Sequence, residues 1–157
     1  MWWRIKRLDF NRQKGEGNRR AMKKLIESGK IPGILAYQQG KAVGWCSIAS
    51  REDFPVLLNS RILKPVDNQP VWSIVCFFIS REHRRSGLTS QLIKAAIKHA
   101  RCRGAKIVEA YPIEPQKKQI PAVFAYTGFA STFRQAGFQE VARRSPTRPI
   151  MRFYITS

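Results

Sequence analysis

Seven residues, RRSGLTS at 84–90, bring two arginines, one glycine and three hydroxyl groups together. They follow an apolar run, VWSIVCFFI at 71–79, and open a segment with helical periodicity. The first turn of a helix has unpaired backbone amides and the positive end of the helix dipole, so it binds anions. Gly87 has no Cβ and lets the backbone approach a phosphate closely. The stretch predicts a phosphate-binding turn; the alternative is an ordinary capped helix with a solvated basic turn.

The elements that flank this turn form a strand–helix–strand unit. Residues 71–79 are apolar on both faces, which is typical of a strand inside a sheet. From Leu88 the apolar residues recur at helical spacing until Gly104 ends the pattern. AKIVEAYPI at 105–113 is expected to be the next strand, and the unit should cross over right-handed. The turn then lies where a central strand passes into a helix.

The rest of the chain continues an alternation of helical and strand patterns. The expected elements are a capped helix after Asn18, a hairpin over 34–48, a loop-like insertion over 49–69, a helix ending at Gly137, and strands over 138–142 and 150–155. This order predicts an α/β fold, one domain over residues 1–157, with a mixed central sheet.

Composition limits the class of protein. The 157 residues are 43% hydrophobic and carry a net charge of +19, so the chain should fold and should attract polyanions. The three cysteines are widely spaced and lack a nearby histidine, so we expect reduced thiols, no metal site and a cytoplasmic protein. We expect no membrane partner, because no apolar run has transmembrane length and the start, MWWRIKRLDF, is too charged for a secretion signal.

Two motifs give the sequence a family resemblance. FFISREHRRSGLTSQL, with FRQAGFQEV at 133–141, resembles the GNAT superfamily of N-acetyltransferases. The coenzyme A loop of that family reads Q/R-x-x-G-x-G/A: Arg84 takes its first position, Gly87 is its glycine, and Thr89 replaces the final Gly or Ala. The resemblance covers residues 32–155. It implies a GNAT-like domain that takes acetyl-coenzyme A as co-substrate and transfers the acetyl group to an amine.

The resemblance also implies a cofactor site. The loop amides from Arg85 to Ser90 would hold the diphosphate, and we expect the Thr89 hydroxyl to donate to a phosphate. The backbone of Phe77 to Ile79 would pair with the pantetheine arm and direct an amide at the acetyl carbonyl. The expected residues are Phe77, Phe78, Ile79, Arg84, Arg85, Ser86, Gly87, Leu88, Thr89 and Ser90.

Acetyl transfer raises the question of a general base. Deprotonating a lysine-like amine at pH 7 costs about 4–5 kcal/mol. Glu109 is the only carboxylate in the expected strand 105–113, where apolar neighbours would raise its pKa and suit it to this role. The alternatives for Glu109 are a solvent-facing strand residue and a structural salt bridge. Tyr111 is expected to orient the substrate or act as an acid, or else to be a half-buried aromatic residue.

The sequence departs from the family pattern at its acid and at its start. The family often has a tyrosine acid five residues before the "GF" phenylalanine, where this chain has Phe133. Tyr126 would then be the acid, or there would be none. Only one good helix precedes residue 34, and the usual first strand is missing. Either MWWRIKR replaces that strand, or the chain begins inside a longer ancestral domain, which is what we expect.

Two other functions compete with acetyl transfer. One is a basic nucleic-acid-binding module, although no known reader pattern is present. The other is a coenzyme A-binding protein without catalysis, which Phe133 and Thr89 suggest. Coenzyme A explains only the local positive charge, so the acceptor is expected to be acidic or associated with RNA or the ribosome. Direct contact with nucleic acid would then come from non-specific charge.

Overall fold

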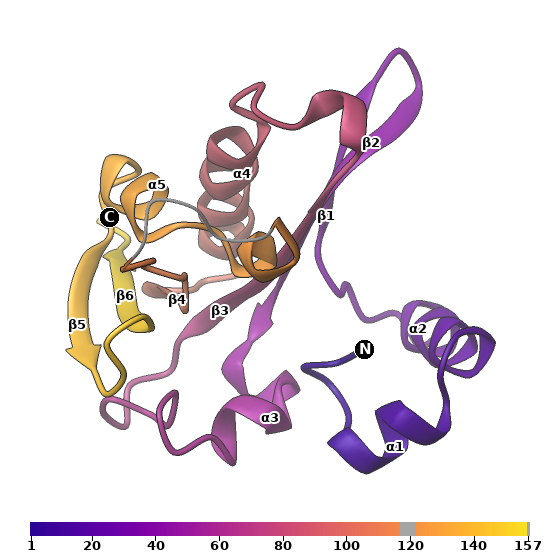
Figure 1. Ribbon diagram of the computed structural model, residues 1–157, viewed down its shortest axis with the longest axis horizontal. Helices are drawn as coiled ribbons and strands as arrows, with labels where there is room; N and C mark the ends of the chain where they lie inside the picture. The colour runs from indigo at the N-terminus through magenta and orange to yellow at the C-terminus, as the bar shows by residue number, and fades with distance from the viewer. Residues whose placement is uncertain (117–121, 157) are drawn as a thin grey trace.

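The computed structural model describes residues 1–116 and 122–156, with one mixed sheet at its centre (Figure 1). Six strands lie in the order β1-β2-β3-β4-β6-β5. Their bounds are β1 Ile34–Gln38, β2 Lys41–Ser50, β3 Trp72–Ile79, β4 Ile107–Ala110, β5 Gln139–Arg143 and β6 Pro149–Tyr154. Only β3 and β4 pair in parallel; the other neighbours are antiparallel. The predicted α/β class and mixed sheet are confirmed.

Two hydrophobic clusters cover opposite faces of the sheet. The long helix α4, Leu88–Cys102, buries Leu92, Ile93 and Ala96 against Ile74 and its neighbours. Burying a side chain such as Ile93 contributes about 1.5–3 kcal/mol. On the other face, α3, Pro55–Leu58, brings Leu57 into a second cluster with Phe54, Val75, Tyr111 and Ile150. A side chain can therefore be assigned to the α4 face or to the α3 face.

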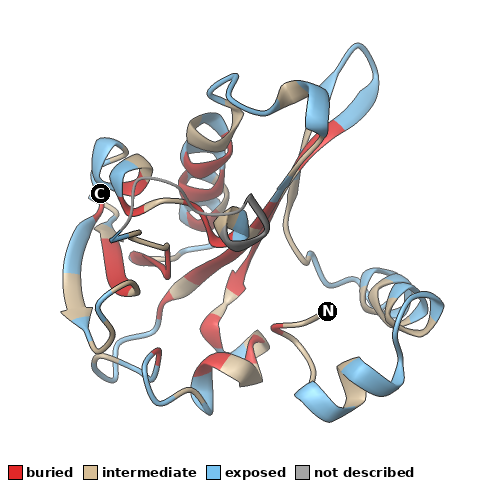
Figure 2. Cartoon of the chain, viewed as in Figure 1, coloured by how far each residue is buried: buried red, intermediate tan, exposed pale blue. Residues whose placement is uncertain are grey.

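The first 33 residues hold two helices and no strand. These are α1, Arg7–Arg12, and α2, Glu16–Glu27, and neither contains a buried residue. Figure 1 shows both standing apart from α4, and Figure 2 shows how much of their surface is exposed. We expected only the second helix. The first was missed because it spans six residues, too few for a helical period to show.

Two further elements are shorter than expected. β4 covers only Ile107–Ala110 of the predicted 105–113, and Pro112 follows, which has no N–H to give to a ladder. The predicted last helix is α5, Ala130–Gln135, and it is separated by Gly128 from a 3-10 helix, η3, Ala122–Thr127. Gly128 has φ +80°, which an α-helix cannot contain. The other 3-10 helices are η1, Arg51–Asp53, and η2, Arg81–His83.

Among the described residues, none of the helices combines the length and the apolar character that a membrane span requires.

A β-bulge lies in the middle of β3. Ser47 of β2 pairs with Cys76, while the next residue of β2, Ile48, pairs with Ile74, so Val75 is one residue too many. Val75 and Cys76 consequently both pack with the α3-face cluster, and Phe77 packs in the α4-face cluster. The bulge changes which side chains of β3 reach each face of the sheet.

Candidate active site

β3 and β4 separate halfway along the sheet. They pair only from Trp72–Val108 to Ile74–Ala110, whereas β2 follows β3 as far as Ile79. The amide of Ser80 donates to the carbonyl of Val43 at 2.9 Å, on the β2 side. Alternation along the strand then turns the amides of Phe77 and Ile79 towards the side that β4 has left. This stretch of β3 can pair with an extended ligand in the gap.

The turn after β3 has the backbone shape that an anion needs. Arg85 has φ +63° and Gly87 has φ +78°, two left-handed residues within three positions. The first backbone bond of α4 runs from the amide of Gln91 to the carbonyl of Gly87 at 3.3 Å. In the described part of the chain, the amides from Arg85 to Ser90 donate to no backbone carbonyl. They form a concave set of donors at a helix N-terminus.

The structure adds a second reason for glycine at position 87. A Cβ there would meet no atom within 4 Å, so crowding by the protein does not require glycine. The left-handed φ favours glycine, because an L side chain costs about 1–2 kcal/mol in that region. Two side chains that precede Gly87 are bound within the turn. Ser86 Oγ donates to the carbonyl of His83 at 2.5 Å, and Arg84 Nε donates to the carbonyl of Ile79 at 3.3 Å.

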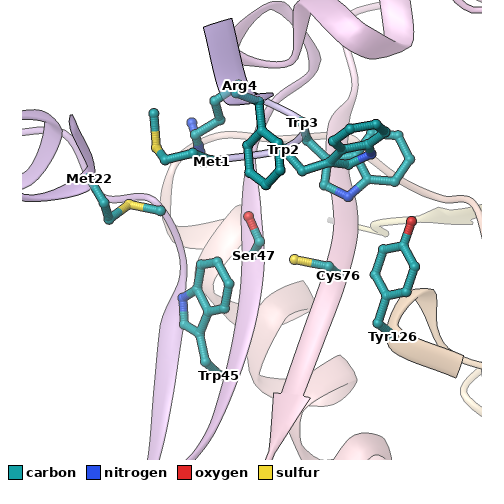
Figure 3. A pocket seen from close by; sticks show the side chains of 10 residues that line it. Met1, Trp2, Trp3, Arg4, Met22, Trp45, Ser47, Cys76 and Tyr126 are labelled. Atoms are coloured by element: carbon teal, nitrogen blue, oxygen red, sulfur yellow. The ribbon is translucent and has the colours of Figure 1, made fainter. Parts of the chain in front are cut away.

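A cavity of about 290 Å³ lies against the α3 face of the sheet at the bulge (Figure 3). Cys76 of β3 lines it, one residue before Phe77, whose amide faces the gap between β3 and β4. Its other walls come from five parts of the chain: Trp2 and Trp3 near the N-terminus, Phe10 on α1, Met22 on α2, Trp45 and Ser47 on β2, and Tyr126 on η3. The cavity thus borders β3 at Cys76, two residues beyond its last pair with β4.

Hydroxyl and thiol groups reach this cavity. Figure 3 shows Ser47, Cys76 and Tyr126 around one space. Burial raises the pKa of the Cys76 thiol to about 11, so the group is protonated at neutral pH. Tyr126 is 37% exposed and therefore accessible to a ligand. Phe133, at the usual tyrosine position, is fully buried, with its ring centroid 6.1 Å from that of Phe77, and supplies no proton.

The structure places Glu109 in a buried ion-pair network on the α3 face. Its Oε1 accepts from Arg51 Nη1 at 2.5 Å and from the Tyr111 hydroxyl at 2.6 Å, and its Oε2 accepts from Arg152 Nε at 2.7 Å. Its side chain has no exposed area, and it does not line the cavity. This geometry does not suit the expected general base, because both oxygens are bound to cations. It supports the alternative of a structural salt bridge.

Tyr111 belongs to the same network. It is 1% exposed, accepts from Arg51 Nη1 at 2.6 Å and lies 2.9 Å from Ser73 Oγ. Burial, and then the charge of Glu109, raises the pKa of its phenol well above the ordinary range. The expected roles as acid or substrate guide require a group that faces a ligand, and this hydroxyl faces Glu109. Arg152 continues the network to Asp67 and lowers the pKa of that carboxyl to about 2.

Sequence reasoning did not find the cavity. Its walls come from six separated segments, and no spacing in the sequence joins Trp45 to Tyr126. Arg51 and Arg152 were also missed as partners of Glu109. The available signal was charge: a carboxylate inside an apolar strand requires a cation nearby, although the sequence does not say which of 29 basic residues supplies it.

Comparisons with known proteins agree with this geometry. The family model described as the acetyltransferase (GNAT) family matches residues 1–129. The chain belongs to the GNAT family of acetyltransferases. The match includes α1 and α2, which the motif resemblance over 32–155 left out. No curated protein sequence matches the chain.

Solved structures share the GNAT fold. A putative GNAT acetyltransferase from Desulfovibrio desulfuricans is 14% identical with a TM-score of 0.56, over 88% of this chain and 79% of that one. A ribosomal-protein-alanine N-acetyltransferase from Brucella melitensis is 15% identical with a TM-score of 0.56, over 89% and 78%. The Escherichia coli ribosomal-protein-S18-alanine N-acetyltransferase gives 15% and 0.52, over 85% and 77%. At these identities the likeness concerns the fold alone.

Proposed function

We propose that this GNAT acetyltransferase transfers the acetyl group by direct attack of an amine on acetyl-coenzyme A, at the point where β3 and β4 separate. Family membership establishes acetyl transfer to an amine. The observation that supports this position for the reaction is the unpaired edge of β3. The amide-rich turn lies at one end of this edge, and the cavity lies beside it on the α3 face of the sheet. Donor and acceptor can therefore approach one carbon atom from two sides of the sheet.

The ten residues expected from the sequence remain the proposed cofactor site. The amides from Arg85 to Ser90 would hold the diphosphate, supported by the left-handed turn at Arg85 and Gly87. Phe77 and Ile79 would pair with the pantetheine arm and place an amide at the thioester oxygen. A structure of the NatC complex bound to Gag peptide and CoA shares the fold, with 9% identity and a TM-score of 0.56. Acetyl-coenzyme A bound at the proposed site would supply the activated acetyl group.

For the proton on the leaving side we propose Tyr126. It is the phenol in the described wall of the cavity, and Phe133 leaves the usual position without one. A positioned hydroxyl can donate to the departing thiolate. Cys76 stays a thiol at neutral pH and is proposed as wall rather than nucleophile. For Glu109 and Tyr111 we propose a stabilising role, since the network in which they lie occupies their polar atoms.

The acceptor is proposed to be an amine carried by an acidic, RNA-associated or ribosome-associated molecule. The net charge of +19 supports such a partner. Two of the similar structures are ribosomal-protein-alanine N-acetyltransferases, which concerns those proteins and lends support here only through the fold. The three cysteines are free, in keeping with the expected cytoplasmic location, which stays a prediction.

Thermal unfolding with acetyl-coenzyme A tests the proposal. A ligand at a hundred times its Kd stabilises the folded state by about 2.7 kcal/mol, so we expect a clear rise in Tm. Gly87→Glu should abolish the rise, because it places a carboxylate and a strained side chain at the diphosphate. Lys41→Glu makes a charge change of the same sign, and a larger one, at the tip of the β1–β2 hairpin and should keep the rise. Absence of any rise in the unmodified protein would overturn the proposal.

A further inference from the structure

The cavity has no acidic wall. Among the described residues that line it, none is Asp or Glu, and Arg4 is the charged side chain. An acceptor amine that arrives as an ammonium would leave water without a counter-ion and face a strongly basic protein. The aromatic rings could hold a cation over their faces, but they would then stabilise the protonated form, which cannot attack.

The cavity offers no side-chain general base among its described residues. Glu109 is bound by Arg51 and Arg152, away from this space. The side chains that reach it are the Ser47 and Tyr126 hydroxyls and the protonated thiol of Cys76, and none of these accepts a proton from an ammonium at neutral pH. Met1 also lines the cavity, and burial lowers the pKa of its α-amino group, which carries no negative charge to hold an ammonium. The side chains therefore favour a nucleophile that enters already neutral, as an amine whose lone pair is delocalised into a ring does.

The walls fit a flat ring with hydrogen-bond acceptors. Trp2, Trp45 and Tyr126 bring aromatic rings to the wall, against which a flat ring can pack, and the Arg7 guanidinium lies 5.7 Å from the centroid of the Trp2 ring. Trp3 is 8% exposed, and in the described part of the chain its buried Nε1–H has no partner. A buried donor without a partner is costly, so this N–H would gain from an acceptor atom on a ligand once the side chains that cover it shift. Ring nitrogens and carbonyls of nucleobases are such atoms.

The segment that carries α1 and α2, beside the cavity, is basic. Phe10 on α1 and Met22 on α2 line it, so both helices border it directly. Six basic side chains of this segment are exposed and belong to no salt bridge among the described residues: Lys6, Arg7, Arg12, Lys14, Arg20 and Lys24. Exposed cations without a salt bridge attract a phosphate backbone. Coenzyme A, at the turn before α4, makes no use of them.

We propose that the acceptor is the ring-bound amine of a nucleobase, in a single nucleic-acid strand whose phosphates lie along α1 and α2. The inference rests on the proposed acetyl transfer. The amine nitrogen forms a bond to the acetyl carbon while the bond from that carbon to sulfur breaks. Sulfur keeps the electron pair of the broken bond. It then takes up one proton of the amine, which is passed through the hydroxyl of Tyr126. The products are the N-acetylated base and the free thiol.

Oligonucleotides of matched length separate the amine from the phosphates. The purified protein with acetyl-coenzyme A should acetylate single-stranded oligocytidylate or oligoadenylate, measured by mass spectrometry and thiol release. Oligouridylate has the same phosphates and no ring-bound amine, so it should bind and remain unmodified. The rate should be nearly flat between pH 6 and 9. Binding of acetyl-coenzyme A with no transfer to any amine-bearing oligonucleotide would overturn the inference.

A peptide with free α- and lysine amines is the third acceptor to be tested, beside the amine-bearing oligonucleotides and oligouridylate. For an ammonium acceptor the rate rises about tenfold per pH unit below the amine pKa. Such a profile on the peptide, without transfer to oligonucleotides, would exclude the nucleobase and leave acetyl transfer intact. Failure of acetyl-coenzyme A to stabilise the protein would instead remove the proposed function itself. The two failures are thus distinguishable.

Charge variants test where the strand lies. Arg20→Glu on α2 should raise the KM for oligocytidylate about tenfold, leave kcat unchanged and lower the salt dependence of binding. Lys41→Glu, on the β1–β2 hairpin, should change neither. Quenching of tryptophan fluorescence by oligouridylate gives the same comparison without turnover. Equal effects of the two variants would contradict the assignment to α1 and α2.

Discussion

Arg152 donates its Nε–H to Oε2 of Glu109 at 2.7 Å, and the two side chains are 3% and 0% exposed. The residues face each other across β4 and β6. Arg51, which follows β2, binds the other oxygen of the same carboxylate. The network therefore joins three parts of the sheet beside the place where β3 and β4 separate. Its removal would loosen the walls of the gap rather than remove a reacting group.

The first prediction concerns Glu109→Gln. Removing one charge from a buried ion pair costs about 3–5 kcal/mol, because the partner cations stay buried. We expect a loss of this order in the free energy of unfolding, measured with denaturant, and a kcat for the folded protein within about threefold of the original. Tyr111→Phe removes one donor to the same carboxylate and should cost about 1–3 kcal/mol, again with kcat preserved.

A different result for Glu109→Gln would support Glu109 as the general base. If Glu109→Gln unfolds at the same denaturant concentration as the original protein but loses about 10²-fold or more in kcat, the carboxylate takes part in proton transfer. The pH–rate profile would then lose its acidic limb in the variant. Tyr111→Phe serves as the comparison, because it alters the same network without removing the charge.

The sequence predicted the architecture well because the signals are local. An apolar run followed by a capped helical period, with glycine after its last turn, marks β3 and α4 without knowledge of any contact. The turn before α4 was located for the same reason, since its two left-handed positions include a glycine. Three short elements were less well predicted: α1 was missed, and β4 and α5 were expected to be longer.

The surroundings of Glu109 and the position of Cys76 were harder to predict from the sequence. The expectation for Glu109 assumed apolar surroundings, which is correct for its neighbours along the strand and wrong for its neighbours in space. Arg51 lies 58 residues earlier and Arg152 43 residues later in the chain. The β-bulge at Val75, which brings Cys76 to the cavity, has no glycine or proline to mark it. Long-range pairing decides both features.

Gly87→Ala gives the second prediction, with Gly104→Ala as its control. Both glycines have left-handed φ, +78° and +80°, at the two ends of α4, and a Cβ added at either position would meet no atom within 4 Å. Each substitution should therefore cost about 1–2 kcal/mol from backbone strain. Only Gly87→Ala should also raise the Kd for acetyl-coenzyme A, which isothermal titration measures. Equal affinity in the two variants would place the diphosphate elsewhere.

The third prediction tests Tyr126 as the acid. Removing its hydroxyl in Tyr126→Phe should lower kcat by about 10²-fold, the lower end for general acid catalysis, because a thiolate leaves without much help. The KM for acetyl-coenzyme A should stay within about twofold. Tyr154→Phe, at the end of β6 and 48% exposed, is the matched control and should leave both constants unchanged. If Tyr126→Phe also keeps its kcat, the thiolate departs without an acid from this residue.

The last prediction decides between direct transfer and an acetylated cysteine. A thiol with pKa about 11 has roughly 300-fold less thiolate at pH 8 than one near 8.5, so Cys76 should alkylate slowly and faster as the pH rises towards 11. Cys102 is exposed and should react first. We expect Cys76→Ala to retain kcat within a few-fold and mass spectrometry to find no acetyl group on the protein between turnovers. Acetylated Cys76 peptides, together with loss of activity in Cys76→Ala but not in Cys102→Ala, would show a two-step mechanism.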